Sequence, residues 1–179
     1  MNKKIIGLVG QIASGKGTIA EYIEKNHGAS THRFSTMLRD LLNRLHIEIT
    51  RENMQDISTI LRKRFGEDLL AKVIAEDVRN DKNNIIVVDG IRRMADIKYL
   101  KEIDGFELIR IVADPKIRYE RLIKRTENHG DTKKTYEEFL ADQKNEADAE
   151  IPIVMEKAEM EINNDGDFKD LEKEIEKIV

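Results

Sequence analysis

The stretch that decides the fold reads Ile5-Ile6-Gly7-Leu8-Val9-Gly10-Gln11-Ile12-Ala13-Ser14-Gly15-Lys16-Gly17-Thr18. Its apolar first part, Ile5 to Val9, predicts a buried strand, and the pattern from Lys16 to Asn26 predicts a helix. Glycines at both ends of the connection let successive backbone N–H groups turn inward around an anion. The helix N-terminus adds unsatisfied N–H groups and about half a positive charge. The stretch therefore predicts a strand, a phosphate-binding loop and a helix in direct succession.

This loop carries the residues that we expect to contact ATP: Gly10, Ala13, Ser14, Gly15, Lys16, Gly17 and Thr18. Lys16 is expected to reach the β- and γ-phosphates, and Thr18 to help hold the Mg²⁺ that accompanies ATP. The strict pattern has Ser or Thr directly after the lysine, whereas here Gly17 takes that place. The alternative is a glycine-rich strand-to-helix turn with a surface lysine and no nucleotide.

Beyond this loop, short apolar runs alternate with helical patterns. Further strands are predicted near 29–34, 84–90, 108–113 and 158–162, and apolar residues from Phe168 to Ile178 mark a closing amphipathic helix. Strands separated by helices pair in parallel through right-handed crossovers. The pattern therefore predicts a three-layer α/β/α fold with a five-stranded parallel sheet, formed by one domain over residues 1–179.

Two insertions interrupt this alternation. The first, about 35–80, contains three stretches with the 3–4 spacing of amphipathic helices. The second, about 126–150, is polar and rich in charges, and we interpret it as a small lid. A plain solvated helical hairpin is the alternative for the second insertion.

Composition limits the possible compartments and partners. The 179 residues are 40% hydrophobic and 37% charged, contain no cysteine, and carry a net charge of −4. No apolar run approaches the roughly 18 residues of a membrane span, and the chain enters a strand pattern without a cleavable signal. We therefore expect a cytoplasmic enzyme with neither a membrane nor a nucleic acid as partner. Every arginine lies in the first 125 residues, which suits a phosphate ligand.

Two further features bear charge near the predicted carboxyl ends of strands. Asp89 ends the buried run before Gly90, where open α/β sheets bind ligands, and it could orient waters around Mg²⁺. An ordinary Asp-Gly turn is the alternative.

One helix face carries three arginines at i, i+3 and i+7: Arg118, Arg121 and Arg125. Like charges at i, i+4 cost about 0.2–0.5 kcal/mol unless an anion lies between them. Pairing with neighbouring acids is the alternative for these arginines.

The segments described above resemble those of P-loop kinases. Residues 15–18, Gly-Lys-Gly-Thr, resemble the form found in adenylate kinases and related nucleoside monophosphate kinases, while residues 10–14 are more similar to the loop of dephospho-coenzyme A kinases. The likeness is tight at 7–20 and 85–93 and looser at 114–125. It implies a P-loop kinase fold whose first insertion binds the phosphate acceptor.

The resemblance also implies roles for individual arginines. Arg39, in a segment similar to the start of the acceptor-binding helices, would grip the acceptor phosphate. Arg92 would do the same from the Asp-Gly-x-Arg segment, with Arg93 as its rival, and one of residues 62–64 could add a contact. Arg121 and Arg125 resemble the paired arginines at the lid base, which stabilise charge on the transferring phosphoryl group.

The acceptor is inferred from what the sequence lacks. A hydroxyl acceptor would want a carboxylate nearby, and dephospho-coenzyme A kinases place an aspartate just after the second strand. Residues 31–35, Thr-His-Arg-Phe-Ser, contain no acid. This favours a nucleoside or deoxynucleoside monophosphate as acceptor. The glutamine that reads adenine in adenylate kinases is missing from 94–101, so the base stays open, with Gln55 and Asp96 as the candidate residues to read it. A hydroxyl-acceptor kinase and a regulatory ATPase are the alternatives, and the oligomeric state is open.

Overall fold

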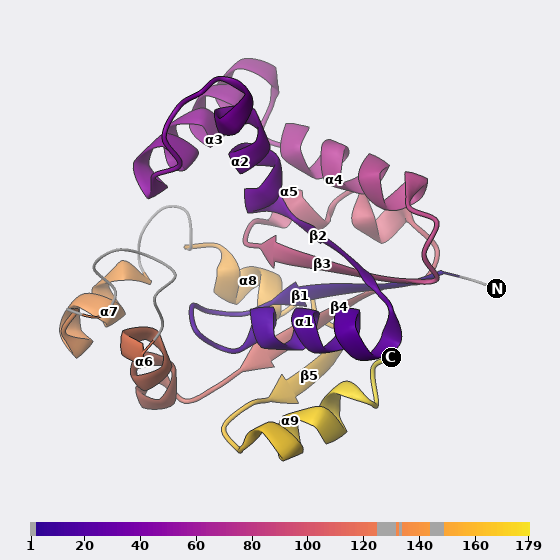
Figure 1. The fold of residues 1–179 in the computed structure, drawn as a ribbon, viewed down its shortest axis with the longest axis vertical. Coiled ribbons are helices and arrows are strands. Elements are labelled where there is room, and N and C mark those ends of the chain that lie inside the picture. The colour runs from indigo at the N-terminus through magenta and orange to yellow at the C-terminus, as the bar shows by residue number, and fades with distance from the viewer. Residues whose placement is uncertain (1–2, 125–131, 133, 144–148) are drawn as a thin grey trace.

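The computed structural model describes residues 3–124, 132, 134–143 and 149–179 (Figure 1). Its strands are β1 (Lys4–Val9), β2 (Ser30–Arg33), β3 (Ile85–Ile91), β4 (Phe106–Val112) and β5 (Met160–Asn163). Its longer helices are α1 (Lys16–His27), α2 (Phe34–Arg44), α3 (Arg51–Phe65), α4 (Leu69–Asn80), α6 (Pro115–Lys124) and α9 (Phe168–Ile175). Shorter helices are α5 (Met94–Ile97), the 3₁₀ turn η1 (Leu100–Glu102), α7 (Tyr136–Asp142) and α8 (Ile151–Met155).

The five strands form one sheet in the order β2-β3-β1-β4-β5, and every pairing is parallel. The predicted five-stranded parallel sheet is therefore confirmed. The chain reverses its direction of winding at β1, which lies between β3 and β4. Parallel sheets of this kind bind ligands beyond the carboxyl ends of the strands at such a reversal. The loop after β1 and the residues that follow β3 and β4 all lie at that edge.

Alternating side chains of the central strands build two apolar layers. On one face, Ile6 and Leu8 pack with α1 and α9 around a cluster that includes Ile23 and Ile175. On the other face, Ile5 packs with α4, α8 and the start of α2, in a cluster whose members include Val9, Leu70, Ile74, Ile86, Val88 and Val154. Because helices cover both faces, the central strands β1 and β3 are apolar almost throughout. The three-layer fold is the predicted one.

The first insertion consists of α2, α3 and α4, which stand together at one end of the molecule (Figure 1). The 3–4 apolar spacing correctly predicted all three helices. The spacing does not tell how deeply each helix is buried: Ile60 and Phe65 of α3 are largely exposed. The reason is that α3 packs mainly on its neighbours α2 and α4, with Leu61 reaching the core cluster, so much of its surface faces solvent.

The second insertion is only partly described. Its described part contains α7, whose first turn is capped by Thr135: the hydroxyl of Thr135 accepts from the N–H of Glu138, and the Glu138 carboxylate accepts from the N–H of Thr135. Tyr119 of α6 packs edge-on against Tyr136 of α7, so α7 rests on α6. The remainder of the predicted lid lies outside the described residues.

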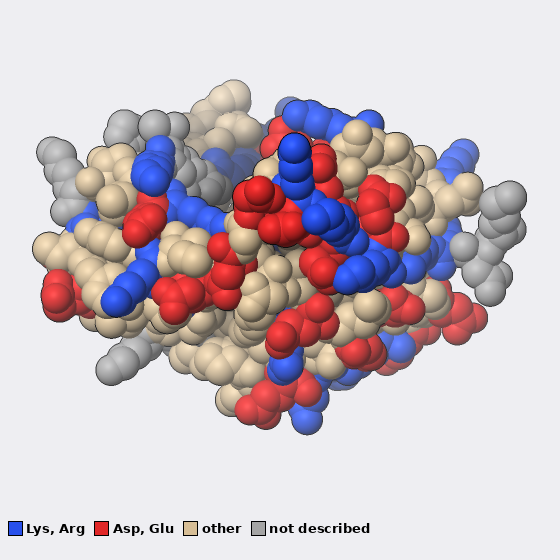
Figure 2. Space-filling view, turned by 90° about the horizontal axis from the view of Figure 1, so that it is seen from below, with Lys and Arg blue, Asp and Glu red and all other residues tan. Residues whose placement is uncertain are grey.

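The side of the molecule that carries α9 presents both signs of charge. Figure 2 shows basic and acidic side chains interspersed on this face, and α9 contributes the ion pairs Lys173–Asp170 and Lys177–Glu174. Among the described residues, no helix is long and apolar enough to cross a membrane.

Candidate functional site

The loop between β1 and α1 adopts a conformation that depends on Gly15. Gly15 lies at the N-cap of α1 with φ 106°, in the left-handed region that disfavours residues with a Cβ. A Cβ at this position would also lie 2.1 Å from Nδ2 of Asn164. Gly10, at the other end of the loop, is equally confined, because its Cβ would lie 2.5 Å from the carbonyl oxygen of Ile111. The loop is therefore a tight ring in which glycine is required at both ends.

Lys16 begins α1 and turns back over this ring. Its ammonium group donates to the carbonyl oxygen of Gly10 at 2.6 Å and to that of Gln11 at 3.1 Å. The side chain thus spans the concave side of the loop, at the positive end of the helix dipole. A cation and a helix N-terminus at one place suit an anionic ligand.

The turn after β5 supports the loop from outside. Asn164 is buried, and its side-chain amide donates to the carbonyl oxygen of Ser14 at 2.8 Å. Its backbone N–H donates to the carbonyl oxygen of Val112 at 2.8 Å, which fixes the turn to β4. The sequence analysis did not single out Asn164 as a site residue, because the contact joins positions 150 residues apart.

Arg118 ties α6 to the same loop. Its guanidinium is buried, donates to the carbonyl oxygens of Ala113 at 3.1 Å and Ile12 at 3.4 Å, and also donates to Oε1 of Gln143 beyond α7. It also lies over the ring of Phe139. Burial lowers the pKa of Arg118 from its usual value, although a guanidinium stays protonated in proteins. Arg118 is therefore a structural tie between the loop and the lid region.

Arg121 lies one turn further along α6, near the turn after β5. The N–H of Asp114 donates to Oδ1 of Asp165 at 2.6 Å and lowers the pKa of that carboxyl; the Asn163 side chain and the charge of Arg121 lower it further. In the part of the chain that the structure describes, Nη1 of Arg121 is buried and has no hydrogen-bond partner. Arg125, the second arginine predicted to act with it, lies outside the described residues.

Asp89 lies near the carboxyl end of β3, two residues before its last residue Ile91, and is largely buried beside the loop. Its Oδ2 lies 2.9 Å from Nη2 of Arg33, and its Oδ1 accepts from the N–H of Gly90 at 2.7 Å. Arg33 is the last residue of β2 and is directly paired with Asp89 in the sheet register. Asp89 therefore lies where the sequence predicted a carboxylate, but it is paired with an arginine that the sequence analysis did not select.

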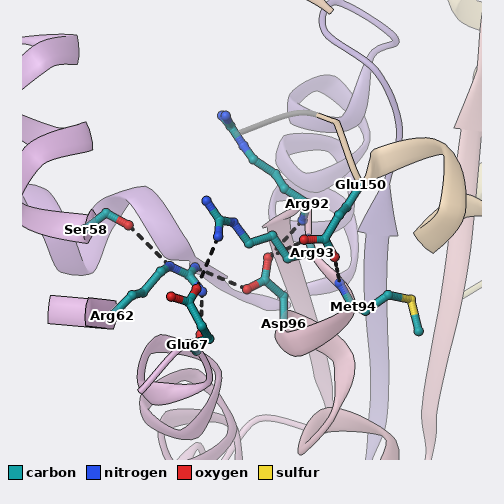
Figure 3. Close-up of polar contacts among 8 residues, drawn as sticks. All are labelled: Ser58, Arg62, Glu67, Arg92, Arg93, Met94, Asp96 and Glu150. Atoms are coloured by element: carbon teal, nitrogen blue, oxygen red, sulfur yellow. Dashed lines mark hydrogen bonds and ion pairs between the residues drawn. The ribbon is translucent and has the colours of Figure 1, made fainter. Parts of the chain in front are cut away.

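The turn that carries Arg92 is built around a second buried carboxylate. Asp96 accepts from the backbone N–H groups of Arg92 and Arg93, both at 3.0 Å, and its other oxygen lies 3.3 Å from Nη2 of Arg62 (Figure 3). The side chain of Arg93 pairs with Glu67 at 3.3 Å. In Figure 3 the exposed guanidinium of Arg92 extends away from these contacts.

These contacts revise two secondary expectations. Arg62 is buried in its ion pair with Asp96, so it is not available to grip an acceptor. Asp96 is likewise occupied by three donors and is not placed to read a base. Arg39 lies in α2 and is half-buried, and its side chain makes no hydrogen bond or ion pair with the described residues.

The groups that could hold a metal ion are few. The described residues contain no cluster of three or more acidic or histidine side chains suited to a metal. The carboxylate of Asp89 and the hydroxyl of the exposed Thr18 are the predicted donors. Mg²⁺ is usually bound by one or two carboxylates together with substrate phosphates and water. This donor set therefore suits a magnesium ion that arrives with a nucleotide.

A five-stranded parallel sheet, with a glycine-bounded loop opening its first helix, is the fold of P-loop kinases. The shikimate kinase of Bacteroides thetaiotaomicron matches this fold with a TM-score of 0.64 over 97% of this chain and 95% of that chain, at 14% sequence identity. At that identity the likeness concerns the fold alone.

Sequence comparison gives the family. The model of a family described as an AAA domain matches residues 6–152, and the chain belongs to this family. The chain is 31% identical over 180 residues to the UPF0200 protein of Pyrococcus abyssi, covering 98% of this chain and 95% of that protein. It is 29% identical over 183 residues to the UPF0200/UPF0201 protein of Archaeoglobus fulgidus, of whose length the match spans 56%.

The conformation of Gly15 gives a first prediction. Gly15→Ala should weaken ATP binding at least about tenfold, because a left-handed alanine costs about 1–2 kcal/mol and the loop must move off Asn164 to admit its Cβ. Gly28→Ala is the matched control at the other end of α1: its φ is 66°, and nothing lies within 4 Å of its Cβ. It should lose stability yet keep wild-type ATP affinity by calorimetry. Wild-type affinity in Gly15→Ala would contradict ATP binding at the loop between β1 and α1.

The Asp96 cluster gives a second prediction. Asp96→Asn should lower the free energy of unfolding by about 3 kcal/mol, because it leaves the charge of Arg62 buried without its partner. Glu174→Gln breaks an exposed ion pair on α9 and should change stability by less than about 1 kcal/mol. Urea unfolding of the two variants measures the difference. Equal losses would mean that the buried pair does not support the turn.

Proposed function

We propose that this protein is a cytoplasmic phosphotransferase that moves the γ-phosphoryl group of ATP, bound with Mg²⁺, to a nucleoside or deoxynucleoside monophosphate. The observation that carries the proposal is the loop at the start of α1. There Gly15 holds a left-handed conformation, and Lys16 lies across a ring of backbone groups at the edge of the sheet where Asp89 also lies.

Unsatisfied buried groups support a phosphate ligand at this loop. Within the described residues, three buried side-chain atoms lack hydrogen-bond partners: Oγ of Ser14 in the loop, Nη1 of Arg121 on α6, and Oγ of Ser30 at the start of β2. The first two bear on the phosphate site. Buried polar atoms in folded proteins are nearly always paired, so such atoms need an explanation. Phosphate oxygens are acceptors that would satisfy both groups. On this proposal Gly10, Ala13, Gly15 and Gly17 supply the backbone that surrounds the phosphates of ATP.

The residues of the chain also suit the magnesium ion. Asp89 and Thr18 would hold it, directly or through water, and the ion would neutralise charge on the β- and γ-phosphates. Lys16 would leave the carbonyl oxygens of Gly10 and Gln11 and pair with those phosphates. Because most catalysis of phosphoryl transfer is positioning and charge neutralisation, the protein needs no covalent intermediate.

The acceptor is inferred from the charges around the transfer point. An oxygen of the acceptor phosphate attacks the γ-phosphorus; a new P–O bond forms, and the bond from the γ-phosphorus to the β–γ bridging oxygen breaks. That bond's electron pair leaves with ADP, and no proton must be removed because the attacking oxygen is already anionic. Arg39 and Arg92 would hold the acceptor phosphate, and Arg121 with Arg125 would stabilise charge on the group in transfer.

A hydroxyl acceptor is the second candidate, since the solved structure reported above is a shikimate kinase. A hydroxyl group needs a proton acceptor close to it. Asp89 is the carboxylate beside the loop, but its oxygens accept from Gly90 and pair with Arg33. Arg33, the last residue of β2, is thus a cation at a position where a hydroxyl acceptor would need a carboxylate as proton acceptor. This charge favours the anionic acceptor.

A third prediction tests the activity itself. The wild-type protein should release ADP from ATP and Mg²⁺ only when a nucleoside monophosphate is added to the assay. Lys16→Ala should abolish the release and keep the fold, whereas Lys25→Ala, an exposed lysine of the same helix paired with Glu21, should leave it unchanged. Release with shikimate or dephospho-coenzyme A alone would favour a hydroxyl acceptor. Slow release without any acceptor would indicate a regulatory ATPase.

A fourth prediction concerns the two acceptor arginines. Arg39→Ala and Arg92→Ala should each raise KM for the monophosphate about tenfold or more, because a charged hydrogen bond is worth about 1.5–3 kcal/mol. KM for ATP should change little. Arg79→Ala, an arginine on the last turn of α4 paired with Glu76, is the control. Equal effects on both substrates would contradict the assignment of Arg39 and Arg92 to the acceptor.

A further inference from the structure

Arg33 is the residue at the proposed site with no assigned role. It ends β2 directly beside Asp89 of β3, and its Nη2 lies 2.9 Å from Oδ2 of that carboxylate. The side chain of Asp89 is 10% exposed, whereas that of Arg33 is 41% exposed. A carboxylate so deeply buried needs a cation close to it. In this structure that cation is Arg33, and its guanidinium is open to the site.

The same guanidinium lies over the start of α1. A Cβ built on Gly17 would be 3.6 Å from Nη2 of Arg33, so the guanidinium is next to the first turn of that helix. At that distance a Cβ would be in ordinary van der Waals contact with the guanidinium, so the two groups are direct neighbours. The first turn of α1 already carries the positive end of the helix dipole and the ammonium of Lys16.

The guanidinium of Arg33, the ammonium of Lys16 and the positive end of α1 thus meet at one place. Such a gathering of positive charge is unfavourable unless anions lie among the groups. Asp89 supplies one negative charge, and it is also the carboxylate expected to hold Mg²⁺. Two cations that share Oδ2 of Asp89 would repel each other at short range. The arrival of Mg²⁺ with ATP would therefore separate Arg33 from Asp89 and leave the guanidinium beside the incoming phosphates.

We propose that Arg33 is a phosphate-binding residue that pairs with Asp89 in the nucleotide-free protein and moves to the phosphates when Mg²⁺ and ATP take its place. The free guanidinium then lies between the γ-phosphate and the acceptor phosphate, where its fork of donors can contact both. Arg33 thereby selects an anionic acceptor. This inference rests on the proposed function for the identity of the acceptor and for the Mg²⁺ at Asp89, and on the observed ion pair between Arg33 and Asp89 for the exchange.

The exchange is tested by binding, without turnover. The dissociation constant of ATP is measured by calorimetry once with Mg²⁺ and once with EDTA. The value in EDTA divided by the value with Mg²⁺ reports how strongly Mg²⁺ assists ATP binding. In Arg33→Gln this ratio should rise about tenfold. With Mg²⁺, the lost phosphate contact is offset by the ion pair that no longer has to break, whereas in EDTA the unpaired Asp89 carboxylate repels the phosphates and raises the dissociation constant of ATP. Arg33→Lys keeps the charge and should stay near the wild-type ratio. An unchanged or smaller ratio in Arg33→Gln overturns the exchange.

Arg79→Gln is the matched control. Arg79 is 42% exposed and ion-paired, much like Arg33, but it lies at the end of α4 near the amino ends of the strands. Its ATP ratio should equal that of the wild type. If Arg79→Gln changed the ratio as much as Arg33→Gln does, the effect would be one of general charge, and the proposal would fail.

The acceptor half of the proposal has its own measurement. If the wild-type protein phosphorylates a nucleoside monophosphate, Arg33→Gln should raise KM for that acceptor about tenfold. Arg33→Lys, which keeps the charge, should raise this KM less. An unchanged KM overturns the acceptor role. If the wild type binds ATP but phosphorylates no monophosphate, the proposed function and this acceptor role fail together, while the binding ratio still decides the exchange at Asp89.

Discussion

The arrangement of the site depends on one constraint, the left-handed backbone at Gly15 packed against the amide of Asn164. This contact holds the loop after β1 in a ring, and the ring sets where α1 begins and which backbone groups point inward. Asn164 in turn is fixed to β4 through the carbonyl oxygen of Val112. The loop is therefore braced from β5 and β4 as well as by its own sequence.

A second theme is the use of arginine–carboxylate pairs at the carboxyl edge of the sheet. Arg62 with Asp96 is buried and fixes the turn after β3, whereas Arg33 with Asp89 is open on the arginine side. A buried pair is costly to break, and it therefore holds geometry. An open pair at a ligand site can exchange partners at lower cost. The Arg62–Asp96 pair thus suits the positioning of Arg92, whereas the Arg33–Asp89 pair suits a contact that changes when a ligand binds.

The described part of the second insertion is linked to the loop after β1 by physical contact. Arg118 donates to the carbonyl oxygen of Ile12 in the loop and to Gln143 beyond α7, and it stacks over Phe139. These partners come from two separate parts of the chain, the loop after β1 and the segment of α7. A displacement of α7 would therefore change the contacts of Arg118 with the loop, which is a direct physical link between the second insertion and the loop after β1.

The sequence by itself determined the fold class, the five strands, the three helices of the first insertion, the loop from Gly10 to Thr18 and the position of Asp89. These features follow from local periodicity and from turn chemistry, which are properties of neighbouring residues. Only the tertiary structure decided the partners: Asn164 beneath the loop, Arg33 on Asp89, Arg62 on Asp96 and Arg118 beneath the lid region. Each of these contacts joins residues far apart in the chain, and a side chain's local pattern says nothing about which distant carboxylate or carbonyl it will meet once the strands have paired.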